Sequence, residues 1–227
     1  MVTIRPEFRR VVGWGLLFLA SAYVLRATYY VLLSAIPRYL TITADSYGVH
    51  FWPRRPWILV HVMVGSLTVV LGLMQFWPWL RNRHRRVHRY LGRAYVTAVA
   101  VAGAASLVLG VRAEVSIGNT AGLTLMGLAW LVVTWIAFQH ARNRRFVLHA
   151  VWMSRSYVLT LAFVVFRIGD NYLERFGIVE DPVARLTLLA WVCWLGPLLL
   201  LEIFRHVVPG PGFLAVRRAT SKRDSAP

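Results

Sequence analysis

The sequence predicts an all-α, polytopic membrane protein with six transmembrane helices and both termini in the cytoplasm. Of its 227 residues, 58% are hydrophobic and only 15% are charged, whereas about a quarter of an average soluble domain is charged. Six apolar runs are each long enough to cross a bilayer, which takes about 20 residues per helix. The sequence lacks the alternating pattern of β-barrel strands. We therefore expect one membrane domain over residues 1–208 and a basic cytoplasmic tail over residues 209–227.

Polar segments separate the predicted spans. In chain order, the first run follows Arg9 and Arg10, and the second follows a segment rich in proline and aromatic residues. The third follows an arginine-rich loop, the fourth a short polar turn, the fifth a second arginine-rich loop, and the sixth an acidic segment. The first run is too long to be only the apolar region of a secretion signal, so an uncleaved span is favoured over a signal peptide. The predicted spans cover residues 11–33, 57–80, 94–111, 121–140, 148–168 and 186–204.

Arginine and lysine are distributed unevenly among the connections. Most of the 26 basic residues lie in the N-terminal segment, in the loops after the second and fourth spans, and in the C-terminal tail. Cytoplasmic loops carry the excess of basic residues in membrane proteins, so both termini are placed in the cytoplasm. Although the net charge is +17, the basic residues lie between apolar runs rather than on one hydrophilic face. The lipid bilayer is therefore the expected partner, and nucleic acid is not.

Several common catalytic and metal-binding motifs are missing. The only cysteine, Cys193, lies inside an apolar run, which excludes a disulfide within the chain, a CxxC redox motif and a cysteine-based zinc site. The sequence has no P-loop, no dinucleotide-binding glycine pattern, and neither HExxH nor GxSxG. The sequence therefore leaves open whether the protein is an enzyme.

The strongest polar cluster is predicted on the cytoplasmic side. His88 precedes the third span and His149 opens the fifth, so both enter the membrane from the same side and can share a depth. A helix that is polar on more than one side does not face lipid, so we expect the fifth span at the centre of the bundle. Helical spacing places His149, Trp152, Met153 and Ser156 on one face and points Arg155 and Tyr157 elsewhere.

Two imidazoles at one depth can ligate a haem iron axially, as in helical cytochromes. Haem b is accordingly the expected cofactor, with His88 and His149 as its ligands. The two propionates of haem need cations, and guanidinium groups are planar and permanently charged. The other residues assigned to this site are Arg89, Arg93 and Arg155 as propionate or anion partners, and Trp152 and Tyr157 as walls of the pocket.

Three classes of function stay open at this point. A haem-binding or redox-associated membrane protein needs His88 and His149 to face each other, together with a redox partner or a small-molecule ligand. A small-solute or anion transporter needs a continuous polar path from His149 to His61. A non-catalytic module that binds lipid or a partner needs only arginines at headgroup level, where they contact phosphates.

Four further ionisable residues lie within the predicted spans or at their ends, where each needs a partner. His61, near the outer end of the second span, is expected to form a hydrogen bond to another helix, and Gly65 one turn on is expected to admit close packing. Arg26 lies deep in the first span, and Arg167 ends the fifth span on the outer side. Glu202, near the inner end of the sixth span, is expected to pair with a cytoplasmic arginine.

The order of these residues resembles that of a known family. The chain carries His61 and Gly65, then His88-Arg89-x-x-Gly92-Arg93-x-Tyr95, then His149-x-x-Trp152-Met153-x-Arg155-x-Tyr157, and finally Arg167. In this it is similar to the bacterial predicted membrane proteins grouped as domain of unknown function 2306, over roughly residues 55–205. The resemblance implies a multi-pass protein of the bacterial cytoplasmic (inner) membrane.

Overall fold

The computed structural model describes residues 36–41 and 52–207, together with the single residues 22, 26, 29 and 33. The predicted first span, apart from those single residues, and the predicted tail lie outside the described residues. The described part of the chain is helical and contains no strand. Its elements are α2 (Ile36–Thr41), η2 (Trp52–Arg54), α4 (Arg55–Phe76), α5 (Pro78–Arg83), α6 (Arg85–Val111), α7 (Ile117–Arg142), α8 (Phe146–Thr160), α9 (Ala162–Arg175) and α10 (Pro182–Val207).

Five helical segments are long and apolar enough to cross a bilayer. They correspond to the second to sixth predicted spans, with α8 and α9 together forming one of them. The prediction of an all-α membrane protein is thereby confirmed, with five candidate spans in the part of the chain described. These segments are Arg55–Phe76, Arg85–Val111, Ile117–Arg142, Phe146–Arg175 and Pro182–His206.

Two helix boundaries differ from the prediction. α4 ends at Phe76, and the last residues of the predicted second span form the separate helix α5. The cause is Pro78, which disfavours helical conformation in the residue before it, and Trp77 accordingly has an extended ψ of 113°. α6 begins at Arg85, well before residue 94, because arginine is a good helix former and extends the helix into the arginine-rich loop.

The fifth predicted span is interrupted near its middle. α8 ends at Thr160 and α9 begins at Ala162, with a turn at Leu161. No proline or glycine lies at this point, but the Thr160 hydroxyl donates a hydrogen bond to the carbonyl of Ser156 at 3.0 Å. Back-bonding of this kind, from a threonine to the carbonyl four residues earlier, bends helices and accounts for a break here.

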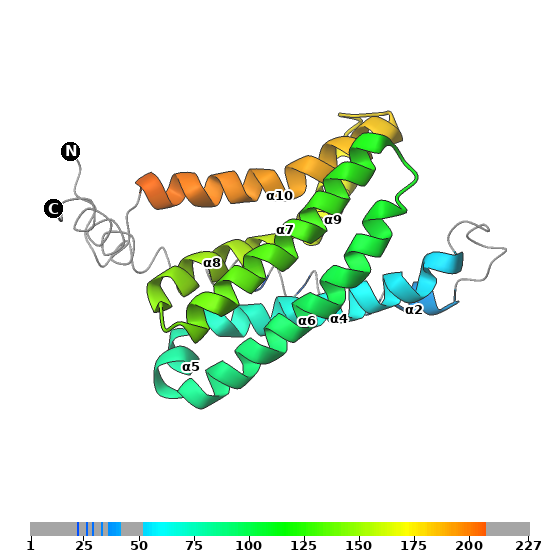
Figure 1. Cartoon of the computed structure of the whole chain (residues 1–227). Coiled ribbons are helices and arrows are strands. Elements are labelled where there is room, and N and C mark those ends of the chain that lie inside the picture. Colours follow the sequence, from blue (N-terminus) through cyan, green and yellow to red (C-terminus); the bar gives the residue numbers. More distant parts are fainter. Residues whose placement is uncertain are drawn as a thin grey trace.

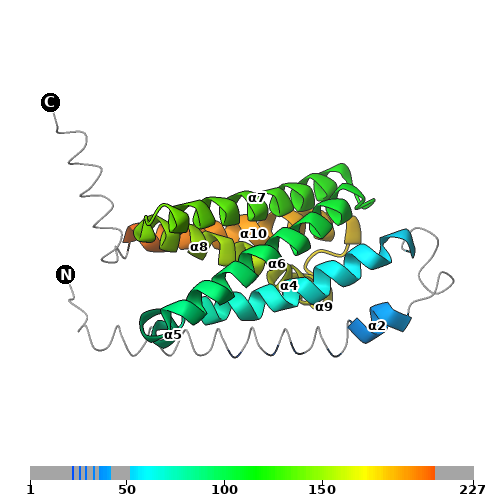
Figure 2. The same cartoon turned by 60° about the horizontal axis from the view of Figure 1, so that its bottom comes forward.

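Four of the described spans pack together as a bundle, which can be followed in Figure 1. Short connections join neighbouring helices, which therefore run antiparallel. α4 packs on α6, α6 on α7 and α7 on α8, while α8 returns to contact α4, so that α6 and α8 lie diagonally across the bundle. α10 packs against α7, α8 and α9 on the side away from α4 (Figure 2). We call one end of the bundle the arginine-rich end; it carries α5, loop 143–145 and the last turn of α10. We call the other end the acidic-loop end; it carries loops 112–116 and 176–181.

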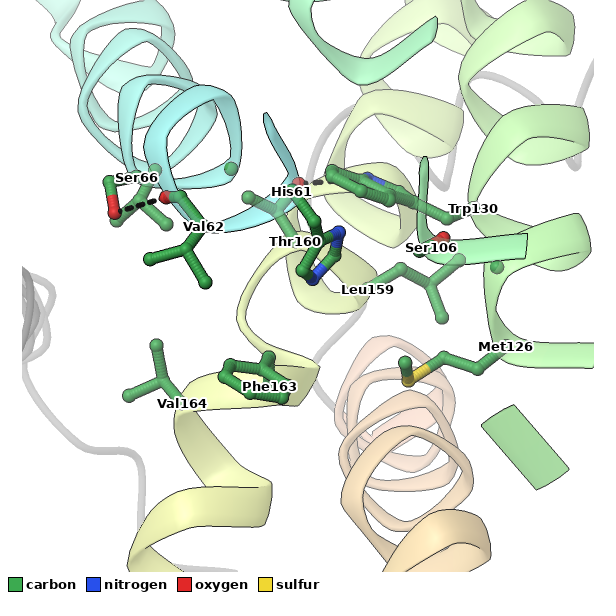
Figure 3. A pocket seen from close by; sticks show the side chains of 13 residues that line it. His61, Val62, Ser66, Ser106, Met126, Trp130, Leu159, Thr160, Phe163 and Val164 are labelled. Carbon is green, nitrogen blue, oxygen red and sulfur yellow. Dashed lines mark hydrogen bonds between the residues drawn. The ribbon is translucent and has the colours of Figure 1, made fainter. Parts of the chain in front are cut away.

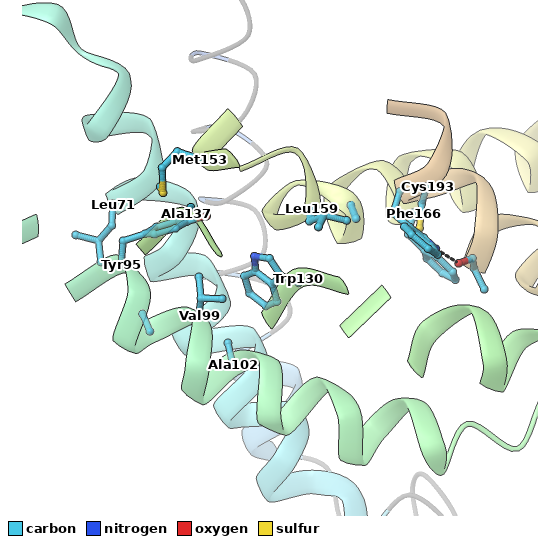
Figure 4. Packing of buried hydrophobic residues seen from close by; sticks show 14 of the residues in the cluster. Leu71, Tyr95, Val99, Ala102, Trp130, Ala137, Met153, Leu159, Phe166 and Cys193 are labelled. Atoms are coloured by element: carbon cyan, nitrogen blue, oxygen red, sulfur yellow. Dashed lines mark hydrogen bonds between the residues drawn. The ribbon is translucent and has the colours of Figure 1, made fainter. Parts of the chain in front are cut away.

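The hydrophobic core follows the length of the bundle. Figure 4 shows it extending from Leu71, Tyr95 and Met153 toward Phe166 and Cys193. Small residues allow the close approach of helices that membrane bundles favour. A Cβ atom at Gly72 would lie only 2.4 Å from the ring of Tyr157, so glycine is required where α4 meets α8.

Candidate functional site

His149 lies in the first turns of α8 with its ring orientation fixed by the backbone of α7. Its Nδ1 atom is 2.8 Å from the carbonyl oxygen of Ala137. A carbonyl oxygen only accepts hydrogen bonds, so Nδ1 carries the proton and donates it. The neutral imidazole then keeps an unprotonated Nε2. A second hydrogen bond of this kind commonly orients histidines that bind metals.

His88 lies near the start of α6, diagonally across the bundle from α8. Its ring is half-buried, and its Nδ1 atom is shielded from solvent. The structure thus brings the two predicted histidines to the same end of the bundle. Among residues 52–207, no three His, Cys, Asp or Glu side chains form a group that could hold a metal ion by themselves. A haem iron needs only two axial ligands from the protein, because the porphyrin supplies the other nitrogens.

Two buried polar atoms near this end are left without hydrogen bonds. They are Nδ1 of His88 and Nε2 of Gln75, neither of which has a partner among the described residues. The Gln75 side chain, in the last turn of α4, borders Gly92 of α6, where an added Cβ would lie 3.3 Å from Oε1. Buried groups without partners cost about 1–3 kcal/mol each and call for an explanation, such as a bound molecule. Sequence analysis missed Gln75, although an amide at the end of an apolar run was a detectable signal.

Arg155 and Glu202 form an ion pair between α8 and α10. The carboxylate of Glu202 accepts hydrogen bonds from Nε and Nη2 of Arg155 at 2.8 and 3.1 Å. Arg205, which sequence analysis did not single out, lies 3.7 Å from the same carboxylate and donates to the carbonyl of Val151 and the hydroxyl of Ser154 at 3.1 and 3.3 Å. Glu202 therefore pairs with arginines at this end, and the Arg155 side chain faces α10.

The remaining residues assigned to the site are spread around it. The guanidinium of Arg155 lies 4.6 Å above the ring of Trp152, a cation–π contact. Tyr157 donates a hydrogen bond to the carbonyl of Val69 at 3.2 Å, on the side of α8 that faces α4. Arg89 and Arg93 are exposed on the surface of α6. The structure thus groups Trp152 with Arg155, and it does not group Arg89 and Arg93 with Arg155.

A chain of buried hydroxyl groups links α6, α7 and α8. The Tyr95 hydroxyl lies 2.8 Å from both Ser156 Oγ and Thr160 Oγ1, and Ser156 Oγ lies 2.6 Å from Thr134 Oγ1. Trp130 Nε1 donates to Thr160 Oγ1 at 3.0 Å. Sequence analysis found Ser156 but not the chain, because the partners come from three helices and only folding brings them together.

His61 faces a cavity near the α8–α9 junction. Its Nδ1 atom lies 3.0 Å from the carbonyl of Ala102 on α6, which is the hydrogen bond to another helix that the sequence predicted. Figure 3 shows its ring next to Leu159 and Phe163, at the edge of a cavity of about 70 Å³. The expectation for Gly65 was wrong: a Cβ atom there would meet nothing within 4 Å, because this glycine borders the cavity instead of a neighbouring helix.

Two further arginines discussed above are exposed on the surface of the protein. Arg167 is exposed, with its guanidinium 5.3 Å from the ring centre of Phe163. Arg26, one of the single residues described, is also exposed. At the acidic-loop end, sequence analysis missed the role of Arg185, which is buried and pairs with Asp170 at 2.9 Å. This pair joins α9 to α10.

Comparison with protein families gives one match. Residues 58–205 match the family described as predicted membrane protein (DUF2306). No curated protein and no solved structure matches the chain.

Proposed function

Because the chain belongs to the predicted membrane protein family DUF2306, we propose a function inside a bilayer: binding of haem b by His88 and His149, in the service of electron transfer. The observation that carries the proposal is the pair of buried polar atoms without hydrogen bonds, His88 Nδ1 and Gln75 Nε2, at the end of the bundle where α8 also carries His149. Helical bundles build cofactor sites at such places, from side chains on facing helices.

The donor set suits a haem iron. His149 donates its Nδ1 proton to the carbonyl of Ala137, so its Nε2 atom could hold the iron, and His88 would supply a second imidazole from α6. A bound haem would supply one-electron chemistry through its iron. The protein would hold the two imidazoles, exclude water through the core around Tyr95 and Met153, and balance charge with nearby arginines.

The arginines have different parts in this proposal. Arg89 and Arg93 are assigned to the propionates, whose carboxylates match a guanidinium fork. Nε and Nη2 of Arg155 already donate to Glu202, so these two donors are not available to a propionate. Arg155 contributes its positive charge and its contact with Trp152. Tyr157, anchored to Val69, is assigned to the wall of the pocket.

We further propose that the complete chain has six spans in the inner membrane of a bacterium, with the arginine-rich end in the cytoplasm. The distribution of basic residues supports this orientation. The described arginines at that end include Arg81, Arg83, Arg85, Arg86, Arg89, Arg93, Arg142, Arg144 and Arg145.

The experiment is an optical spectrum of the detergent-solubilised protein, expressed with ample haem, before and after reduction with dithionite. We expect a Soret band and sharp α-bands on reduction, both lost in His88→Ala and in His149→Ala. His84→Ala is the matched control, because His84 lies at the same end of the bundle, packs against Trp79 and carries no role in the proposal. A spectrum without haem bands, or bands unchanged in both variants, contradicts it.

The transport alternative has less support. A transport site for anions needs guanidinium groups that face a cavity and have no carboxylate partner. Arg155 and Arg205 instead both pair with the carboxylate of Glu202. The hydroxyl chain gives part of a polar path, but Met153 and Trp152 separate Ser156 from His149 along α8. A lipid-binding role for the exposed arginines is compatible with haem binding.

A further inference from the structure

The cavity beside His61 lies between α4, α6, α7 and the junction of α8 with α9. Figure 3 shows His61, Ser106 and Thr160 at its wall, together with apolar side chains such as those of Leu159 and Phe163. Its volume is about 70 Å³. A water molecule takes up about 30 Å³, so there is room for about two. A cavity with only apolar walls stays dry, whereas a few polar partners suffice to hold water, so the polar atoms of the wall decide what this cavity holds.

The hydrogens of the polar side chains in this wall are all used within the protein. His61 donates from Nδ1 to a backbone carbonyl of α6. The hydroxyl groups of Ser66 and Ser106 each donate to a backbone carbonyl of their own helix at 2.7 Å. Trp130 donates to Thr160, which in turn donates to a carbonyl of α8. The side chains that line the cavity therefore have no hydrogen left to give to a ligand.

Three of these side chains keep unused acceptors. A neutral imidazole with its hydrogen on Nδ1 has an unprotonated Nε2, and the described part of the chain brings no donor to this atom in His61. The oxygens of Ser66 and Ser106 each keep two lone pairs when their hydrogens are donated. A ligand of this cavity must therefore be small and must donate hydrogen bonds. Water meets both conditions, whereas a chloride ion or a lipid acyl chain has no hydrogen to donate.

Thr160 belongs both to the wall of the cavity and to the buried hydroxyl chain. Its Oγ1 atom lies 2.8 Å from the Tyr95 hydroxyl, which lies at the same distance from Ser156 Oγ. When Tyr95 donates to Ser156, Thr160 keeps one lone pair open, and water in the cavity can donate to it. Rotation of one hydroxyl group thus connects the cavity to the chain.

We propose that this cavity binds water, that the water donates a hydrogen bond to Nε2 of His61, and that it exchanges protons with the hydroxyl chain through Thr160. Histidine is a common proton shuttle, because its imidazole both accepts and donates protons near neutral pH. The water therefore lets protons move between His61 and Ser156, across part of the depth of the membrane. The proposal does not depend on haem binding, and its test has a different readout.

The test compares the exchange of two indole N–H groups with D₂O, followed by NMR of the full chain labelled with ¹⁵N at tryptophan. Trp130 and Trp194 are both buried, at 6% and 9% exposure, and their indole groups donate within the protein at 3.0 and 2.9 Å. Of the two, only Trp130 lines the cavity. We expect its N–H to exchange at least about tenfold faster, because water must reach a buried N–H before it can exchange. Trp130→Phe and Trp194→Phe assign the two signals.

Two variants remove the water in different ways. A Cβ atom at Gly65 meets nothing within 4 Å, so the side chain in Gly65→Val extends into the cavity that this glycine borders. We expect Gly65→Val to slow the exchange of Trp130 to the rate of Trp194 and to leave Trp194 unchanged. His61→Leu replaces the acceptor by an apolar side chain and is expected to have the same effect. It also takes the place of Gly65→Val if that variant does not fold.

Three outcomes would overturn the proposal. Equal exchange of the two indole groups in the wild type would show that the cavity is dry. Rapid exchange of Trp130 in Gly65→Val would show that water reaches the indole by another route. Unchanged exchange of Trp130 in His61→Leu would show that His61 does not hold the water.

Discussion

Thr160 is the residue on which the buried hydroxyl chain depends most. It accepts a hydrogen bond from Trp130 Nε1, shares one with the Tyr95 hydroxyl, and donates to the carbonyl of Ser156. The chain as a whole contains six contacts but only five donor hydrogens, one on each of Thr134, Ser156, Tyr95, Thr160 and Trp130. One contact therefore lacks a hydrogen at any moment, and rotation of the hydroxyl groups moves that contact along the chain.

This count predicts different costs for two conservative substitutions. Tyr95→Phe removes one donor and two contacts, so every remaining contact keeps a hydrogen, and we expect a loss of about 1 kcal/mol in the free energy of unfolding. Thr160→Val removes the acceptor of the Trp130 indole N–H, which is then buried without a partner, and we expect about 2 kcal/mol. Reversible unfolding in mixed detergent measures both values. A larger cost for Tyr95→Phe than for Thr160→Val would contradict the hydrogen-bond count.

Residues of the candidate site differ in how far the sequence could predict them. His88, His149 and Glu202 were found because ionisable groups stand out in apolar runs. The partner of His149 is a backbone carbonyl of Ala137, which no side-chain pattern indicates. The ion pair between Arg155 and Glu202 forms because α10 packs beside α8, and the sequence does not show which helices pack together.

At the scale of elements, the contact between α4 and α8 closes the central bundle. Gly72 admits the ring of Tyr157, and the Tyr157 hydroxyl reaches the carbonyl of Val69 one turn earlier. The ring also lies 5.2 Å from that of Phe76. One side chain thus holds α8 against three successive turns of α4, close to the site proposed for haem.

Two glycine substitutions test this contact. Gly72→Ala places a Cβ atom 2.4 Å from the Tyr157 ring, so the ring must move, and we expect a loss of about 1–3 kcal/mol in the free energy of unfolding. Gly65→Ala, also on α4, meets nothing within 4 Å and is expected to be neutral or to stabilise by up to about 1 kcal/mol, through helix propensity. Equal effects of the two substitutions in the same unfolding assay would show that the α4–α8 contact does not limit stability.

The helices themselves were largely predictable, and their interruptions were only partly so. Apolar runs located all five described spans because length and hydropathy are properties of the sequence. The turn at Leu161 was not predicted, because the run is uniformly apolar there and the break lies beside a threonine hydrogen bond that depends on side-chain rotamer. The end of α4 was missed although Pro78 marks it, because hydropathy was weighted above the effect of proline on the preceding residue.

At the scale of the whole molecule, charge separates the two ends of the bundle. α5, the start of α6 and loop 143–145 are rich in arginine, and the segment between α9 and α10 carries Glu180 and Asp181. Basic residues fix the orientation of membrane proteins, so this separation assigns the arginine-rich end to the cytoplasm in our proposal.

Labelling of single cysteines tests the orientation. In a Cys193→Ala background, Arg144→Cys and Glu180→Cys place one thiol in a loop at each end, both at exposed positions. A membrane-impermeant maleimide is expected to label Glu180→Cys in intact spheroplasts and to label Arg144→Cys only after lysis. The reverse pattern would place the arginine-rich end outside and contradict the proposed topology.

The central claim, that His88 and His149 would hold a haem iron, is tested most directly by electron paramagnetic resonance of the ferric protein. We predict a low-spin signal typical of two imidazole ligands in the wild type, because axial ligand identity sets the electronic state of the iron. Loss of one imidazole in His149→Ala should convert it to a high-spin signal or abolish it. An absence of any haem signal, or a low-spin signal that persists in both His88→Ala and His149→Ala, would contradict the account.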